Sequence, residues 1–240
     1  IDILREEGIA VSEKKAGRTA ADGAVLAYTD EAKKVNVLVE VNSETDFVAK
    51  NEKFIEMTEE IVEAAIASGA SDVDSLLASE LGGHTVKDRI DGMIAIIGEK
   101  MEVSHVEVLE GEHVEAYMHR TNPDLPPQVG VLVATDKGAA SVAHDIAVHI
   151  AALAPSYLNR ESVPQDVVDN ETRIATETTI AEGKPEKAVP KIVAGRMNGF
   201  YKSVVLEDQG FARDPKVSVG QVAKDAGGKI TCIDVRTTVT

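Results

Sequence analysis

The sequence predicts an α+β protein in which two similar units each combine an antiparallel sheet with helices on one of its faces. Short apolar runs with the two-residue period of strands alternate with longer runs that have the 3.6-residue period of helices. The order strand, strand, helix, helix, strand occurs twice along the 240 residues. In the second occurrence an extra segment, roughly residues 155–214, separates the two helices.

The first unit begins with two predicted strands, residues 24–28 and 35–41, which a charged turn joins. A second helix begins near Thr85, where an acid three residues later gives a weak capping box, and Gly98 ends it. Residues 101–109 then alternate as the third strand. The first helix of the unit lies between the strand pair and the helix that begins near Thr85. Its inward positions are Phe54, Thr58, Ile61, Val62, Ala65 and Ile66.

The second unit repeats this order. Residues 113–117 and 129–133 are its strand pair, and they repeat the Ala-Tyr and Val-Leu-Val of the first pair. Residues 218–221, Ser-Val-Gly-Gln, form a better capping box for a short helix that ends at Gly227, and residues 230–235 supply the last strand. The helix after the strand pair carries on one face Val142, Ile146, Ile150 and Leu153.

The insertion is predicted to be an antiparallel helical hairpin, with helices over residues 170–181 and 190–206 and a turn at residues 182–185. Two interpretations of this hairpin stay open: it is a packing arm for another chain, or it folds onto its own domain. Apolar residues of the two arms are expected to face each other, with Ile174 and Ile180 opposite Ile192, Val193, Met197, Phe200 and Val204.

The start of the chain resembles the last turns of a helix that Gly8 ends, so we expect a preceding helical piece to be missing. The expected division is a helical remnant and linker over 1–12, a first subdomain over 13–111, a second over 112–154 and 215–240, and the insertion over 155–214.

Charge and composition exclude several function classes. The formal net charge of -16 argues against nucleic-acid binding, because phosphate binding needs clustered Lys and Arg. The basic cluster at residues 13–18 is better explained as a solvated linker. No apolar run approaches the roughly 18 residues of a membrane span. The single Cys232 fits a reducing compartment, and its place in a strand pattern predicts a buried, inert thiol.

No catalytic or metal-binding signature is evident. The six histidines do not form an H-E-x-x-H pattern. Gly227-Gly228-Lys229 lacks the first glycine and the final Ser or Thr of a phosphate-binding loop. His149, near an apolar helix face, is expected to be a buried structural histidine. No residue is therefore assigned a catalytic or metal-binding role.

Residues 44–51, Glu-Thr-Asp-Phe-Val-Ala-Lys-Asn, contain one of only eight aromatic side chains, since the chain has four Tyr, four Phe and no Trp. Phe47 lies in a polar run just past an apolar strand. Either it turns inward as ordinary core, or it points outward to touch another molecule. Composition alone favours the inward position.

Residues 40–50 closely resemble the signature of the elongation factor Ts family, and residues 15–23, 97–100, 130–133 and 195–197 resemble other segments of it. The resemblance implies a core of two similar subdomains with a helical hairpin inserted in the second. Family members begin with a small three-helix domain, of which residues 1–8 are expected to be the final turns.

The resemblance also implies a function. The chain would bind elongation factor Tu in its GDP-bound and nucleotide-free forms and promote GDP release by destabilising the Mg²⁺ and phosphate site, which allows GTP loading. No bond is made or broken, so the protein would be neither a covalent enzyme nor dependent on a cofactor. The implied location is the bacterial cytoplasm or an organellar matrix or stroma, with no nucleic acid and no membrane as partner.

The resemblance assigns the exchange contact to Thr45, Asp46, Phe47 and Val48, with the Phe wedged between helices of the partner's nucleotide-binding domain. It implies further contacts at His119, Ile97 and Gly98. The hairpin is a candidate element for a homodimer or a heterotetramer. The alternative function is a non-catalytic scaffold that uses the hairpin, which would leave an outward Phe47 unexplained.

Overall fold

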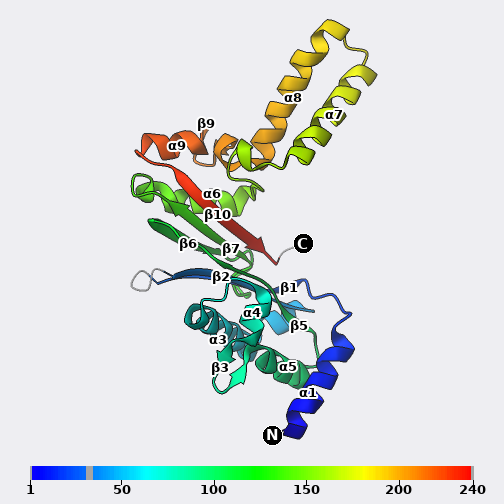
Figure 1. The fold of residues 1–240 in the computed structure, drawn as a ribbon, viewed down its shortest axis with the longest axis vertical. Helices are drawn as coiled ribbons and strands as arrows, with labels where there is room; N and C mark the ends of the chain where they lie inside the picture. Colours follow the sequence, from blue (N-terminus) through cyan, green and yellow to red (C-terminus); the bar gives the residue numbers. More distant parts are fainter. Residues whose placement is uncertain (1, 31–34, 239–240) are drawn as a thin grey trace. The chain divides into compact units, whose positions relative to one another are not determined.

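A computed structural model describes the backbone of residues 2–30 and 35–238, and the side chains of residues 9–29 and 36–238 (Figure 1). The chain divides into two compact units, Ile1–Ala134 with Thr231–Thr240, and Thr135–Ile230. The predicted charged turn at residues 31–34 lies outside the described residues. The α+β class is confirmed, since helices and antiparallel strands alternate along the chain.

The N-terminal helix α1 spans Asp2–Lys15, so the predicted helix end at Gly8 is wrong. A glycine inside a helix costs about 1 kcal/mol relative to alanine, and tertiary packing readily offsets that cost. Here α1 packs against α5 (Val86–Ile97), and Val11 contacts the core. The basic segment at residues 13–18 is not a linker, because Lys14 and Lys15 belong to the last turn of α1 and Lys15 donates a hydrogen bond to the Gly98 carbonyl.

The first sheet has the strand order β1-β2-β5 and is antiparallel on both sides of its central strand. Its strands are β1 (Asp22–Asp30), β2 (Val35–Ser43) and β5 (Met101–Val108). In β2 the consecutive residues Val37, Leu38 and Val39 are all fully buried. Successive side chains point to opposite faces of a strand, so both faces of this sheet are covered. The sequence predicted helices on one face and did not indicate what covers the other face.

Helices cover one face of this sheet (Figure 1): α3 (Glu52–Ser68), α4 (Val73–Ala78) and α5. The predicted inward face of α3 is confirmed, with Phe54, Thr58 and Ile61 fully buried. At the start of α5, Thr85 and Asp88 form a complete capping box. The short strands β3 (Glu80–Leu81) and β4 (His84–Thr85) form a hairpin before α5 that was not predicted.

The second sheet, also in the first unit, has the order β10-β7-β6, which matches β5-β2-β1. Its strands are β6 (His113–His119), β7 (Val129–Thr135) and β10 (Ile230–Thr237). Val25 and Leu38 of the first sheet share a core with Leu132 and Ala134 of the second. Gly130 permits this close approach, because a Cβ at this position would clash with Val25.

The second unit contains α6 (Ala143–Leu153), the short 3₁₀ helix η1 (Ala140–Val142) before it, and α9 (Val219–Asp225). The strands β8 (Gly210–Phe211) and β9 (Asp214–Ser218) precede α9 as β3 and β4 precede α5. The predicted reciprocal capping box of α9 is incomplete. Ser218 accepts from the Gln221 amide, but the Gln221 side chain donates to Asp225 instead of returning to the cap.

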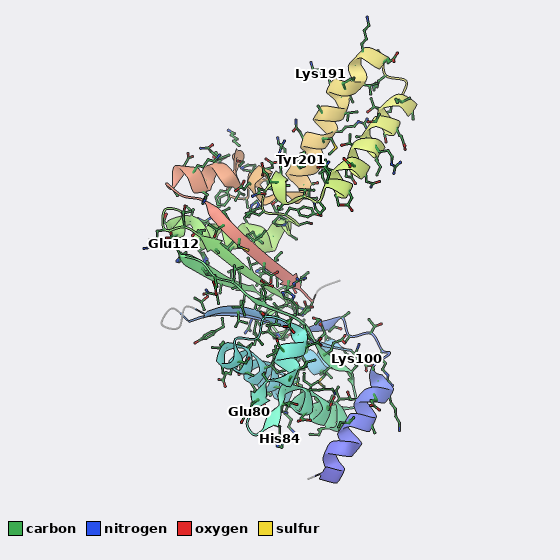
Figure 2. All side chains as sticks on the ribbon, viewed as in Figure 1. Glu80, His84, Lys100, Glu112, Lys191 and Tyr201 are labelled. Carbon is green, nitrogen blue, oxygen red and sulfur yellow. The ribbon has the colours of Figure 1, made fainter. Side chains whose placement is uncertain are left out.

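The predicted hairpin is formed by α7 (Gln165–Ala181) and α8 (Val189–Val204), which lie side by side and run in opposite directions (Figure 1). The 3₁₀ helix η3 (Glu186–Ala188) belongs to the turn, and η2 (Arg160–Ser162) and η4 (Leu206–Asp208) flank the two helices. Tyr201 lies near the base of α8 (Figure 2), where the Arg160 guanidinium stacks 4.5 Å from its ring centroid.

The predicted facing residues of the hairpin are wrong on one arm. Ile174 and Ile180 are 42% and 61% exposed, whereas Ala175 and Thr179 are buried. Small side chains let two helices approach closely, and Thr179 satisfies its hydroxyl by donating to the Ala175 carbonyl at 2.6 Å. The larger isoleucines therefore remain on the outer surface of α7.

His149 is a fully buried structural histidine, as predicted. The backbone N–H of Ala212 donates to its Nδ1 at 3.1 Å, so its Nε2–H donates to the Gln209 side-chain oxygen at 2.9 Å. The Phe211 ring stacks on it at a centroid distance of 6.0 Å. Burial lowers the pKa of His149, because a charged imidazolium would lose its hydration.

Cys232 is exposed in β10, so the prediction of a buried core thiol is wrong. Ile230, two residues earlier on the same face of β10, is buried, so strand alternation alone does not account for the exposure of Cys232. Partial burial of the sulfur still raises the pKa of the Cys232 thiol, with Glu107 and Asp234 acting in the same direction. The thiol therefore stays protonated at neutral pH.

Lowering the pH is expected to destabilise the fold through His149. The unfolded histidine takes up a proton near its ordinary pKa of about 6.5, while the folded one resists it. The contribution of neutral His149 to the free energy of unfolding is fully present above the ordinary pKa. It is lost as the pH falls below that pKa, by at most about 1.4 kcal/mol per pH unit. Urea denaturation between pH 7.5 and 5.5 measures it. His149→Gln should flatten the dependence, whereas the exposed His144→Gln should not; equal slopes in wild type and His149→Gln would contradict this.

Candidate functional site

The site is built on α2 (Asp46–Ala49), a single turn that directly follows β2. Thr45 caps this turn by accepting a hydrogen bond from the Val48 amide. Val48 and Ala49 are buried in the main core of the first unit, while Phe47 between them and the cap is 80% exposed. The outward position of Phe47 is confirmed, and the core interpretation that composition favoured is wrong.

One ion pair, between Asp46 and Lys50, lies beside Phe47. Lys50 pairs with Asp46 at 2.8 Å, and its Nζ lies 5.9 Å from the Phe47 ring centroid. The hydrogen bond from Lys50 holds the pKa of Asp46 below its usual range, and the same bond raises the pKa of Lys50. Both groups are therefore charged at neutral pH. Because the pair is solvent-accessible, it orients the two side chains more than it stabilises the fold.

Glu44 fixes the end of β2. Its carboxylate accepts the Lys100 backbone N–H at 2.6 Å and the Arg18 guanidinium at 3.2 Å. The Lys100 bond is the main reason that the pKa of Glu44 lies below its usual range, and Arg18 adds to it against the opposing effect of burial. The Thr45 hydroxyl donates to Glu99 at 3.0 Å. The segment that carries Phe47 is thus tied to the residues just after α5.

The end of α5 joins this group. Gly98 ends the helix in the left-handed conformation, with φ of 85°, and its carbonyl accepts from Lys15 of α1. The Lys100 side chain (Figure 2) donates to the Arg18 carbonyl at 3.0 Å. Three segments distant in sequence therefore meet: the residues after α1, the end of β2 and the end of α5.

The structure thus brings Ile97 and Gly98 to the group that carries Thr45, Asp46, Phe47 and Val48. Ile97 packs partly against the core. Ile96 beside it is 70% exposed and was not predicted. The helical spacing could have revealed it, since the inward positions Ile90, Ile94 and Ile97 leave Ile96 on another face. Glu44, Glu99 and Lys100 were also missed as positioning groups, because only the fold brings them together.

His119 lies elsewhere in the first unit, at the end of β6 in the second sheet. It is exposed, and the Tyr117 hydroxyl lies 3.1 Å from its Nδ1. Its carbonyl accepts the Gln128 backbone N–H at 3.0 Å, which fixes the backbone at this strand end.

The described side chains contain no group of three or more His, Cys, Asp or Glu residues placed to hold a metal ion. A surface groove of about 630 Å³ lies along β1 and α3, lined by apolar side chains together with Glu59 and Glu63. In the described part of the chain, no helix is long and apolar enough to span a bilayer.

The sequence model of the family described as Elongation factor TS matches residues 44–238. The chain belongs to the elongation factor Ts family. The match begins at Glu44 and includes the Phe47 segment, the second sheet and the hairpin. Membership places the chain among the translation elongation factors of protein biosynthesis.

Curated relatives agree with this assignment. The chain is 52% identical over 235 residues to "Elongation factor Ts" of Beutenbergia cavernae, a match that covers 96% of this chain and 84% of the relative. It is 52% identical over 234 residues to the protein of that name from Micrococcus luteus, with the same coverage. The Elongation factor Ts of Arthrobacter sp. is 51% identical over 234 residues, also with 96% and 84% coverage.

Replacing Glu44 by Gln is expected to loosen the Phe47 segment. The substitution keeps the shape but removes the charge that both Arg18 and the Lys100 amide meet, and hydrogen bonds to charged groups contribute about 1.5–3 kcal/mol. Backbone amides of residues 46–50 should exchange with deuterium at least several-fold faster, as measured by mass spectrometry. Glu56→Gln, an exposed acid in α3, is the matched control. Unchanged protection in Glu44→Gln would show that the charge of Glu44 is not what holds the segment.

Proposed function

We propose that this chain binds elongation factor Tu, both GDP-bound and nucleotide-free, and accelerates GDP release by destabilising the Mg²⁺ and phosphate site so that GTP can load. The exposure of Phe47 on a fixed segment is the observation that carries this proposal. Thr45 and Val48 would share the contact, and Asp46 would orient it. A rigid aromatic side chain loses little conformational freedom when it enters a pocket, so it serves well as an interface anchor.

The thermodynamics of exchange explain why a rigid anchor is needed. A nucleotide held at nanomolar affinity represents about 12 kcal/mol of binding free energy. A factor that binds the nucleotide-bound and nucleotide-free forms of its partner equally well does not shift the equilibrium between them. An exchange factor must therefore prefer the nucleotide-free form. Phe47 would provide the preference by entering a gap that opens only when the nucleotide site is distorted. By reciprocity, GDP and Mg²⁺ weaken the binding of this chain by the same factor.

This mechanism makes and breaks no covalent bond, so we propose an exchange factor that is not a covalent enzyme and uses no cofactor. Every step is a change in noncovalent contacts between two proteins. The relatives described above are bacterial, which supports the cytoplasm as the place of action. Neither a nucleic acid nor a membrane takes part in the proposed cycle.

A second contact is proposed at His119. This residue is exposed at the end of β6, with its backbone held by Gln128 and its ring beside the Tyr117 hydroxyl. Phe47 belongs to the first sheet layer and His119 to the second, so the two would engage different domains of elongation factor Tu. Ile97 and Gly98 are proposed as contacts near Phe47.

The hairpin supports an additional role in assembly. Ile174 and Ile180 are exposed on the outer surface of α7, away from the buried Ala175 and Thr179. Exposed apolar surface marks many protein interfaces. We propose that the hairpin packs on another chain, in a homodimer or in a heterotetramer with elongation factor Tu. A scaffold without exchange activity is the alternative function.

Replacing Phe47 by Ala should leave the fold intact and reduce exchange. Exposed substitutions usually change stability by less than about 0.5 kcal/mol, whereas loss of an interface anchor costs about 2 kcal/mol or more, roughly a 30-fold change. Release of fluorescent GDP from elongation factor Tu measures the effect, with the exposed aromatic Tyr28→Ala as control. A loss of several kcal/mol in stability, with normal exchange per folded molecule, would instead make Phe47 a structural residue.

Replacing Ile174 and Ile180 together by Ser is expected to reduce self-association and to leave GDP release unchanged. Both side chains are exposed on α7, so the hairpin itself should fold normally. Light scattering over a concentration series measures the mass, and the GDP-release assay runs on the same samples. If the wild-type chain is a monomer at every concentration when alone, and forms only a 1:1 complex with elongation factor Tu, the hairpin is not a packing arm.

A further inference from the structure

Two large apolar side chains in the described part of the first unit are far more exposed than the others. Phe47 is 80% and Ile96 is 70% exposed, whereas Tyr28 and Met118 are below half. A single exposed isoleucine is ordinary on a protein surface and carries no meaning by itself. The significance of Ile96 depends on where the fold places it relative to Phe47.

Helix geometry gives the direction in which Ile96 projects. Residues seven apart lie on nearly the same face of a helix, two turns along, so Ile96 shares a face with Arg89. The Arg89 guanidinium bonds the Glu60 carboxylate of α3 at 2.6 Å. The face of α5 that bears Ile96 is therefore the one beside α3, while Ile90 and Ile94 point into the core.

The end of α5 is fixed next to α2. Glu99 accepts the Thr45 hydroxyl at 3.0 Å, and the Lys100 amide donates to Glu44 at 2.6 Å. Residues 44 and 45 directly precede α2, and two residues, Lys50 and Asn51, separate the end of α2 from the start of α3. Ile96, in the last turn of α5, is consequently held at the same end of the first unit as Phe47, on the side where α3 starts.

We propose that Ile96 is a second apolar contact for elongation factor Tu, continuous with the contact made by Phe47. This inference rests on the proposed function, because the partner is the one that Phe47 is proposed to enter. One anchor leaves the partner free to rotate about it. A second anchor on another element, tied to the first by hydrogen bonds, fixes the direction from which Phe47 enters.

The neighbouring Ile97 is less suited to this role. It packs partly against the core of the first unit, so much of its apolar surface is already buried before any partner binds. Most of the apolar area that this helix end still offers belongs to Ile96. Replacing Ile97, proposed above as a contact, should therefore lower stability as well as affinity, whereas replacing Ile96 should lower affinity alone.

The test compares Ile96→Gln with Leu153→Gln. Glutamine is a good helix former, so neither substitution should disturb its helix. Leu153 is a matched control, since it is an apolar residue in the last turn of α6 that is 48% exposed and belongs to no proposed contact. GDP release is measured over a concentration series of each variant. Ile96→Gln should raise the half-saturating concentration about tenfold, which corresponds to about 1.4 kcal/mol, and leave the maximal rate nearly unchanged.

A direct binding measurement to nucleotide-free elongation factor Tu separates the possible outcomes. Weaker binding by Ile96→Gln, with Ile96→Leu close to wild type and Leu153→Gln unchanged, supports the inference. Wild-type affinity in Ile96→Gln would overturn it, even if Phe47→Ala abolishes exchange and so upholds the proposed function. If the wild-type chain neither binds elongation factor Tu nor releases GDP, the proposed function itself fails. If Ile96→Gln lowers the melting temperature, its affinity is calculated per folded molecule and then compared with that of the wild-type chain.

Discussion

The hydrogen bond from the Lys100 amide to the Glu44 carboxylate is the contact on which the site depends. It joins the end of a strand to the end of a helix more than fifty residues later, and Arg18 adds a third segment to the same carboxylate. Without it, the single turn of α2 would be held by the buried Val48 and Ala49 and by the hydrogen bond from Thr45 to Glu99. A one-turn helix is not stable by itself, because nucleation costs more than its few hydrogen bonds return. The position of Phe47 is therefore set by tertiary contacts.

This constraint explains how an exposed aromatic side chain can act on a partner. An exchange factor must couple its own binding to a strained state of the partner, and a flexible anchor would adapt to the unstrained state as well. Phe47 is carried on a backbone whose neighbours are buried or hydrogen-bonded, so little freedom is lost on contact. Ile96 is exposed on the helix that the same bonds hold in place, and as a second contact it would fix the direction of approach.

Much of the fold could be predicted, because local signals agreed with the tertiary structure. The periodicity of α3 was sufficient to predict its inward face, and the cap at Thr85 was sufficient to predict the start of α5. The repeated strand order indicated the duplicated sheets. Predictions failed where tertiary contacts determine how far a helix extends or which of its sides is buried. Packing on α5 carries α1 through Gly8, and close helix contact at Ala175 places Ile174 outside. For the site, the exposure of Phe47 followed from the family resemblance and not from composition. The contacts of Glu44 needed the fold, because the groups that meet there are distant in sequence.

The central claim is that the chain prefers elongation factor Tu without its nucleotide. The most direct measurement is the dissociation constant of the chain for nucleotide-free elongation factor Tu and for its GDP and Mg²⁺ complex, determined by titration calorimetry under the same conditions. We predict binding about 100-fold tighter to the nucleotide-free form, in the range that coupling free energies of a few kcal/mol produce. Equal affinity for the two forms would contradict the claim, because a factor with no preference cannot displace GDP however tightly it binds.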